Sequence, residues 1–252
     1  MLNGIANRQK LMPRENYLPG MCFLLFSAIL MPLQQFSASL IANTLLLWVL
    51  SMVMKSSNHP APKTVLYNTG VILGIAILLY SPSILFISIF LLSILILRPF
   101  VLREWVLGIL GILTPFYFLL SFRFLKSLDP FWYWGDLYLH RPFFNILPSA
   151  IPSYMILLFM LLSGILYGQK YMQRHIVLTR RSWSIVYLTL IVAFFMTFFG
   201  DLQLGPTYLP ALLPFSLIGS CAFFYPDSKW FVHILHWSLF ILAIKIQYFS
   251  TI

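Results

Sequence analysis

Residues 66–97 contain no charged side chain, and several other stretches of this chain are nearly as apolar. Runs of about 18 or more apolar residues are typical of membrane-spanning helices, because lipid offers no hydrogen bonds to an open backbone. A membrane β-barrel would need segments of about ten residues that alternate polar and apolar side chains, and these runs do not alternate. The sequence therefore predicts an all-α fold, a polytopic transmembrane helical bundle.

Charge is scarce along the whole chain. Its 252 residues include 16 Lys and Arg and 6 Asp and Glu, and 60% of the residues are hydrophobic. A soluble domain carries charge on about a quarter of its residues. We therefore expect a single integral membrane domain over residues 1–252, with the lipid bilayer as a partner. The net charge of +10 is attributed to Lys and Arg in cytoplasmic loops, so no nucleic-acid partner is expected.

The apolar runs predict about nine spans, and the run 66–97 decides their number. As one helix, its 32 residues would measure about 48 Å, against a hydrocarbon core of about 30 Å. Divided at Ser81-Pro82-Ser83, it gives a hairpin of two helices of about 22 Å each, which is short for a bilayer. The predicted spans are 17–34, 36–54, 66–80, 83–97, 105–122, 148–168, 184–200, 207–225 and 230–247.

The distribution of basic residues favours the hairpin. With the run divided, 12 of the 16 Lys and Arg lie on the side of the N-terminus and 4 on the other; with one long helix the division is 9 against 7. Because basic residues gather in cytoplasmic loops, we expect nine spans, a cytoplasmic N-terminus and a C-terminus outside. The twelve are Arg8, Lys10, Arg14, Lys55, Lys63, Arg98, Arg103, Lys170, Arg174, Arg180, Arg181 and Lys229, and the four are Arg123, Lys126, Arg141 and Lys245.

The longest predicted cytoplasmic loop is 169–183. It carries Lys170, Arg174, Arg180 and Arg181. We interpret it as a topology anchor, and it could also lie against anionic lipid headgroups.

The part of the chain around the hairpin has a recognisable pattern. Asn43 leads through a run of leucines to a basic turn, and the segments Tyr67–Ala76, Leu79–Ser83, Arg98–Trp105 and Gly108–Phe116 follow. The stretch Leu45–Leu120 resembles an uncharacterised family of multi-pass inner-membrane proteins from Bacteroidota. The Arg-Pro-Phe…Arg-Glu-Trp segment is its most specific part. The resemblance implies lineage and location, and it transfers no active-site residue.

The same block has a physical interpretation of its own. Gly70 and Gly74 are four residues apart and lie on one helix face, where they allow a neighbouring backbone to approach closely. Arg103 and Glu104 are adjacent and do not face each other on a helix, so each is expected to bond a different loop or a headgroup. Trp105 suits the aromatic belt at the membrane interface. We interpret the block as a packing and anchoring element.

The predicted outer loop 123–147 is the main place where chemistry could occur. It combines two carboxylates, a histidine and an arginine with several aromatic side chains, a set that could bind a sugar and perform acid–base catalysis. The alternative is an interfacial loop whose aromatic rings lie at the headgroups. The candidate catalytic residues are Asp129, Asp136, His140, Arg141 and, from a second outer turn, Asp201.

No cofactor or metal site is expected. His233 and His236 share a face of the last span, but a metal needs further ligands at the same depth, and none is evident in the spans. The remaining histidines fall in loops on both sides of the membrane. Cys22 and Cys221 lie inside apolar runs and are interpreted as small buried residues.

These observations favour a protein of the bacterial inner membrane that is not an enzyme. We expect a structural or assembly component of the cell envelope, with other envelope membrane proteins as partners. Two alternatives stay open. One is a periplasm-facing enzyme that acts on lipid-linked glycan through the five candidate residues, and the other is a transporter of an apolar or lipid substrate.

Overall fold

A computed structural model describes residues 1–30, 37–57, 62–128, 151–172, 177–199, 208–226 and 228–249. The regular elements within these ranges are helices, which confirms the all-α prediction. Six of them are long and apolar enough to cross a membrane, by length and composition. The chain is therefore a helical membrane protein.

The chain divides into two compact units, and each is described by itself. Unit 1 comprises Phe36–Pro142 and Tyr187–Pro210 together with Met1, and unit 2 comprises Leu2–Gln35, Phe143–Val186 and Ala211–Ile252. The prediction of a single membrane domain over residues 1–252 stays a prediction.

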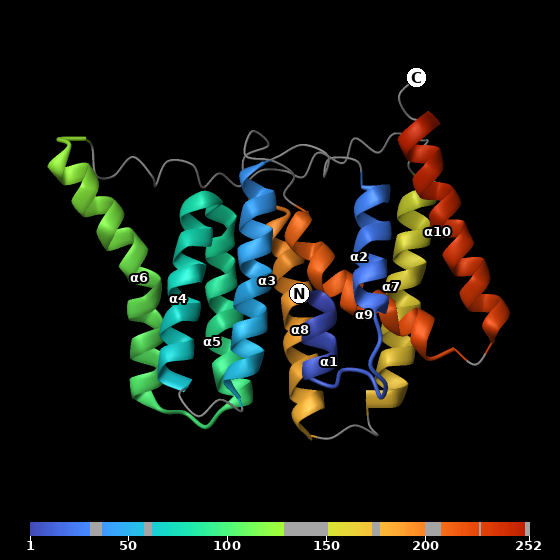
Figure 1. Cartoon of the computed structure of the whole chain (residues 1–252), viewed down its shortest axis with the longest axis horizontal. Helices are drawn as coiled ribbons and strands as arrows, with labels where there is room; N and C mark the ends of the chain where they lie inside the picture. Colours follow the sequence, from blue (N-terminus) through green and yellow to red (C-terminus); the bar gives the residue numbers. More distant parts are fainter. Residues whose placement is uncertain are drawn as a thin grey trace. The chain divides into compact units, whose positions relative to one another are not determined.

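Unit 1 contains the hairpin over residues 66–97, the helix before it, the helix after it and half of a later helix. Helix α4 packs against both α3 and α6, and α5 packs against α3. Figure 1 shows this group in blue to green. The helices are α3 (Ala38–Ser56), α4 (Pro62–Leu79), the 3-10 helix η2 (Ser81–Leu85), α5 (Phe86–Leu97), α6 (Leu102–Leu125) and the second half of α8 (Val177–Met196).

The chain reverses direction between α4 and α5. Tyr80 is extended, with φ −147° and ψ 100°, and η2 follows with Pro82 in its first turn. The reversal brings the end of α5 back to the end of α3, where the Arg98 Nη1 donates a hydrogen bond of 2.8 Å to the Ser56 carbonyl oxygen. A continuous helix over 66–97 would place these residues about 50 Å apart. The run 66–97 therefore forms two helices with a reversal between them, as predicted, and not one long helix.

Helices α4 and α6 run in the same direction and meet through glycines. A Cβ atom added to Gly70 would collide with the Gly108 carbonyl oxygen and would lie 3.0 Å from the Ile112 nitrogen, and one added to Gly74 would lie 2.5 Å from the Ile112 carbonyl oxygen. The backbones are in contact, as the spacing of Gly70 and Gly74 predicted. The Tyr67 and Thr114 hydroxyls, 3.1 Å apart, add a hydrogen bond across this contact.

Helix α6 leaves α4 beyond Pro115. Proline cannot donate to the carbonyl four residues earlier and crowds it, which bends a helix at this point. The buried residues of α6 are Glu104, Gly108, Gly111 and Ile112, all of them before the proline. In Figure 1 the second half of α6 leans away from α4.

Unit 2 is built around α9. Eleven of its thirteen residues are buried, and it packs against α2 and α7, while α10 packs against α2. A Cβ atom added to Gly164 of α7 would collide with the Ile218 carbonyl oxygen of α9, so these backbones are also in contact. The helices are α1 (Leu2–Arg8), α2 (Leu18–Ile29), α7 (Ile151–Met172), the first half of α8, α9 (Leu212–Phe224) after the 3-10 turn η6 (Leu209–Ala211), and α10 (Lys229–Phe249).

The prediction of a basic loop over residues 169–183 is wrong, because most of these residues are helical. Helix α7 continues to Met172 and α8 begins at Val177, so Lys170, Arg180 and Arg181 lie on helices. The start of α8 is held by the N-terminal segment: the Trp183 Nε1 donates 3.1 Å to the Leu11 carbonyl oxygen, and the Ser182 hydroxyl donates 3.2 Å to the Gln9 Oε1. Hydropathy alone does not predict the start of α8, because its first two turns are polar and are stabilised by hydrogen bonds to the N-terminal segment.

A described helix overlaps each of the nine predicted ranges, but the bounds and lengths of the helices differ from expectation. Helix α4 begins at Pro62 rather than residue 66 and is long enough to cross, so this half of the hairpin is not short. Three apolar helices, Leu18–Ile29, Ser81–Leu97 and Leu209–Phe224, have fewer than 18 residues. The number of nine spans therefore stays a prediction.

Candidate functional site

The residues predicted to form a catalytic site cannot be placed in the fold. Asp129, Asp136, His140 and Arg141 fall within 129–150 and Asp201 within 200–207, both outside the described residues. The enzyme hypothesis therefore stays a prediction.

Two basic residues assigned to the same outer loop are described. Arg123 lies in the last turn of α6, and the Lys126 ammonium, at its C-terminal cap, lies 5.8 Å from the centre of the Phe122 ring.

Four other basic residues of unit 1 gather at the opposite end of this helix group. Lys55 lies in the last turn of α3, Lys63 in the first turn of α4, Arg98 at the end of α5, and Arg103 in the first turn of α6. They come together because the chain reverses at η2. We call this set, with Glu104, the basic end of unit 1.

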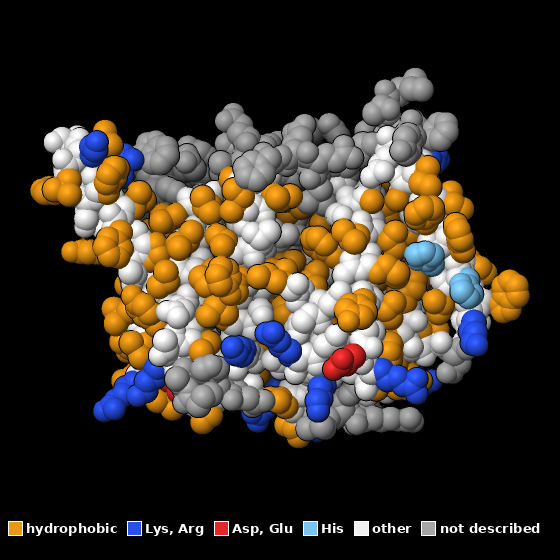
Figure 2. Space-filling model, viewed as in Figure 1, with side chains coloured by type: hydrophobic (Ala, Val, Ile, Leu, Met, Phe, Trp, Pro, Cys, Tyr) orange, Lys and Arg blue, Asp and Glu red, His pale blue; other side chains and the backbone are white. Residues whose placement is uncertain are grey.

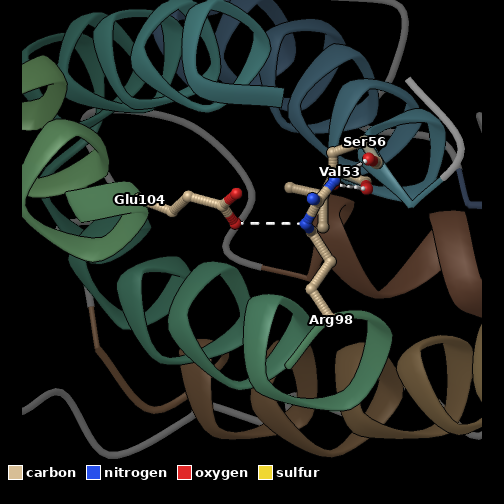
Figure 3. Close-up of polar contacts among 4 residues, drawn as sticks. All are labelled: Val53, Ser56, Arg98 and Glu104. Carbon is tan, nitrogen blue, oxygen red and sulfur yellow. Dashed lines mark hydrogen bonds and ion pairs between the residues drawn. The ribbon is translucent and has the colours of Figure 1, made fainter. Parts of the chain in front are cut away.

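Arg98 joins three helices at this basic end. Its Nη1 bonds the Ser56 carbonyl oxygen at the C-terminus of α3, and its Nε lies 3.1 Å from the Glu104 Oε2 at the N-terminus of α6. Figure 3 shows the arginine between the two partners. The Ser56 hydroxyl in turn donates 2.7 Å to the Val53 carbonyl oxygen. One side chain therefore ties α3, α5 and α6 together.

The electrostatics of this contact follow the helix dipoles. A cation near the C-termini of α3 and α5 and an anion in the first turn of α6 are each placed where a helix end favours them. The Glu104 side chain is 5% exposed and that of Arg98 20% exposed. The Arg98 Nε and Glu104 Oε2 atoms are close, but the geometry of the contact is not that of a hydrogen bond. The contact is a largely buried ion pair, and its role is structural.

Sequence reasoning missed this pair. Glu104 was expected to bond another loop or a headgroup, whereas it pairs with Arg98, six residues earlier and beyond Pro99. A signal was present, because Glu104 is the single acid between Glu15 and Asp129. Trp105, expected at the interface, packs its ring against Phe100 with a centroid distance of 5.3 Å.

The two histidines of α10 are not gathered with other ligands in the described part of the chain, where no group of three or more His, Cys, Asp or Glu could hold a metal ion. The His236 ring lies 6.5 Å from the Phe223 ring and 6.5 Å from the Phe240 ring. This environment suits a packed aromatic side chain.

Comparison of the chain with protein-family models, with curated proteins and with solved structures gives no significant match. The resemblance of Leu45–Leu120 to the Bacteroidota family therefore stays a prediction from the residues.

Proposed function

We propose that this chain is a multi-pass inner-membrane protein that serves as a structural or assembly component of the cell envelope. The observation that carries the proposal is the second half of α6. Residues 116–125 follow Pro115, and none of them is buried within the described structure. Among the described residues, this segment therefore exposes apolar side chains that a membrane helix of another protein could contact.

The composition of this face favours a protein partner over lipid alone. Five of its ten residues are aromatic, and the exposed fractions of Tyr117, Phe118 and Phe124 are 68%, 66% and 79%. Figure 2 shows large hydrophobic side chains over α6 at the left. Aromatic residues are enriched in the cores of protein interfaces. Four of the five are Phe, which lacks the polar group that draws Trp and Tyr to the headgroup region.

The proposed topology has nine spans, the N-terminus in the cytoplasm and the C-terminus in the periplasm. Its support is the reversal at η2, which returns Arg98 and Arg103 to the end of unit 1 that holds Lys55 and Lys63. Basic residues gathered at one end of a helix group are typical of a cytoplasmic face.

Site-specific crosslinking tests the partner face. A photoreactive amino acid replaces Phe118 in cells, and we expect a discrete crosslinked protein that co-purifies in mild detergent. The matched control is the same amino acid at Leu113, which is 53% exposed on the same helix before the proline. We expect lipid adducts at Leu113 and no discrete protein. Identical patterns at the two positions would contradict the proposal.

A second arm separates assembly from catalysis. Alanine replaces Asp129, Asp136, His140, Arg141 and Asp201 together, and the crosslink at Phe118 is measured again with the level of membrane-inserted protein. We expect the crosslink to be unchanged and the cells to grow as cells with the wild-type protein do. A growth defect with the crosslink intact would instead support the enzyme alternative.

A further inference from the structure

A hollow of about 290 Å³ lies where α4 and α6 begin. It is lined by Lys63 of α4 and by Leu102, Arg103, Val106 and Leu107 of α6. Figure 2 shows basic side chains at the lower left, below the apolar surface of this helix group. The hollow therefore combines two cations with an apolar wall.

The two cations stand where helix dipoles add to their charge. Lys63 is the second residue of α4 and Arg103 the second of α6. A helix N-terminus carries partial positive charge and disfavours Lys and Arg, each by a few tenths of a kcal/mol to about 1 kcal/mol. Two such residues at two such ends concentrate positive potential in one place, and an anion there would relieve it.

The nearby acid does not neutralise this charge. The Glu104 Oε2 lies 3.1 Å from the Arg98 Nε, and its side chain is 5% exposed. Adjacent residues on a helix project about 100° apart, so Arg103 and Glu104 face different sides. Within the described residues, neither Lys63 nor Arg103 takes part in an ion pair.

The apolar wall continues along the outer face of α6. Val106, Leu110 and Leu113 follow at helical spacing, with exposed fractions of 47%, 49% and 53%. They extend over about 10 Å from the hollow in the direction of the membrane interior. A ligand that fits both parts has an anionic head and a hydrocarbon tail.

We propose that the hollow binds one anionic phospholipid. The phosphate lies between the Lys63 ammonium and the Arg103 guanidinium, whose planar donors suit phosphate oxygens, and an acyl chain follows Val106 and Leu110. Basic pockets between membrane helices are a recurrent form of headgroup recognition. The inference rests on the membrane location of the chain and is independent of the proposed partner at Phe118.

Lipid binding by the purified full chain tests this site. The protein in detergent is titrated with phosphatidylglycerol and, separately, with phosphatidylcholine, and bound lipid is counted by native mass spectrometry. We expect one tightly held phosphatidylglycerol and no equivalent phosphatidylcholine. Each basic residue near a headgroup is worth about a fivefold change in affinity, so Lys63→Gln and Arg103→Gln should each weaken binding about fivefold, and the double variant about 30-fold.

Lys126→Gln is the matched control, because Lys126 is also an exposed lysine, at the opposite end of α6. It should leave the affinity unchanged. An equal loss in this variant, or no loss in Lys63→Gln and Arg103→Gln, would overturn the site. Displacement of the lipid by millimolar inorganic phosphate would overturn the lipid assignment in favour of free phosphate. The single variants suffice if the double variant does not insert into the membrane.

Discussion

Arg98 is the residue on which the arrangement of unit 1 depends most directly. It holds a carbonyl oxygen of α3 and a carboxylate of α6 from the end of α5. Its partners lie 42 residues before it and 6 residues after it. Removing one member of a largely buried pair leaves the other charge without compensation, which costs more than the pair itself contributes.

Replacing one partner of the ion pair should therefore destabilise the protein strongly. We expect Arg98→Met to lower the free energy of unfolding by about 3 kcal/mol, because Glu104 stays buried without a cation. Glu104→Gln keeps the shape and should cost about 1–2 kcal/mol. Thermal unfolding in detergent measures both.

A matched control and a double variant make this prediction specific. Lys55→Gln, exposed at the same basic end of unit 1, should change stability by no more than about 0.5 kcal/mol. The double variant Arg98→Met/Glu104→Gln should be more stable than the sum of the single effects implies, because neither charge is left alone. Strict additivity would show that the two side chains do not interact.

At the scale of elements, the contact between α4 and α6 depends on the absence of side chains. A Cβ atom at Gly70 would meet backbone atoms of Gly108, Gly111 and Ile112, which cannot rotate away as a side chain can. The spacing of Gly70 and Gly74 predicted a close approach on this face. It could not predict α6 as the neighbour, since spacing within one helix says nothing about its partner.

Gly70→Ala should weaken this contact. Alanine favours helix by about 1 kcal/mol over glycine, but the collision with backbone costs about 1–3 kcal/mol, so we expect a net loss of stability or a separation of the two helices. Gly4→Ala is the matched control, because Gly4 also lies in a helix and a Cβ atom there has nothing within 4 Å. We expect Gly4→Ala to be neutral or stabilising in the same thermal assay. A stabilising Gly70→Ala would mean that α4 and α6 do not touch at this position.

The limits of sequence reasoning are visible in other elements too. Apolar length predicted the class and the approximate positions of the described helices α2 to α10, because burial in lipid requires long uncharged runs. It did not predict the short helix α1. It misplaced the starts of α4 and α8, because charged residues lie in their first two turns: Lys63 in α4, and Arg180 and Arg181 in α8. The Arg98–Glu104 pair was missed because it depends on the path of the short connection 98–101 between α5 and α6, which is not a periodic feature.

For the molecule as a whole, the reversal at η2 decides the side of the membrane on which every later helix begins. Pro82 in η2 and extended Tyr80 divide an apolar run that hydropathy alone would allow as one helix. If this division were absent, Arg98 and Arg103 would lie on the side opposite Lys55 and Lys63. The basic end of unit 1, the hydrogen bond from Arg98 to Ser56 and the proposed phospholipid site all depend on it.

Reporter fusions on either side of α5 test this division most directly. Alkaline phosphatase, which is active outside the cytoplasm, and a fluorescent protein, which is active inside, are fused after Ser83 and after Phe100. We expect phosphatase activity after Ser83 and fluorescence after Phe100. Signals from the same side at both positions would contradict the reversal, and fluorescence after Ser83 would contradict the proposed orientation.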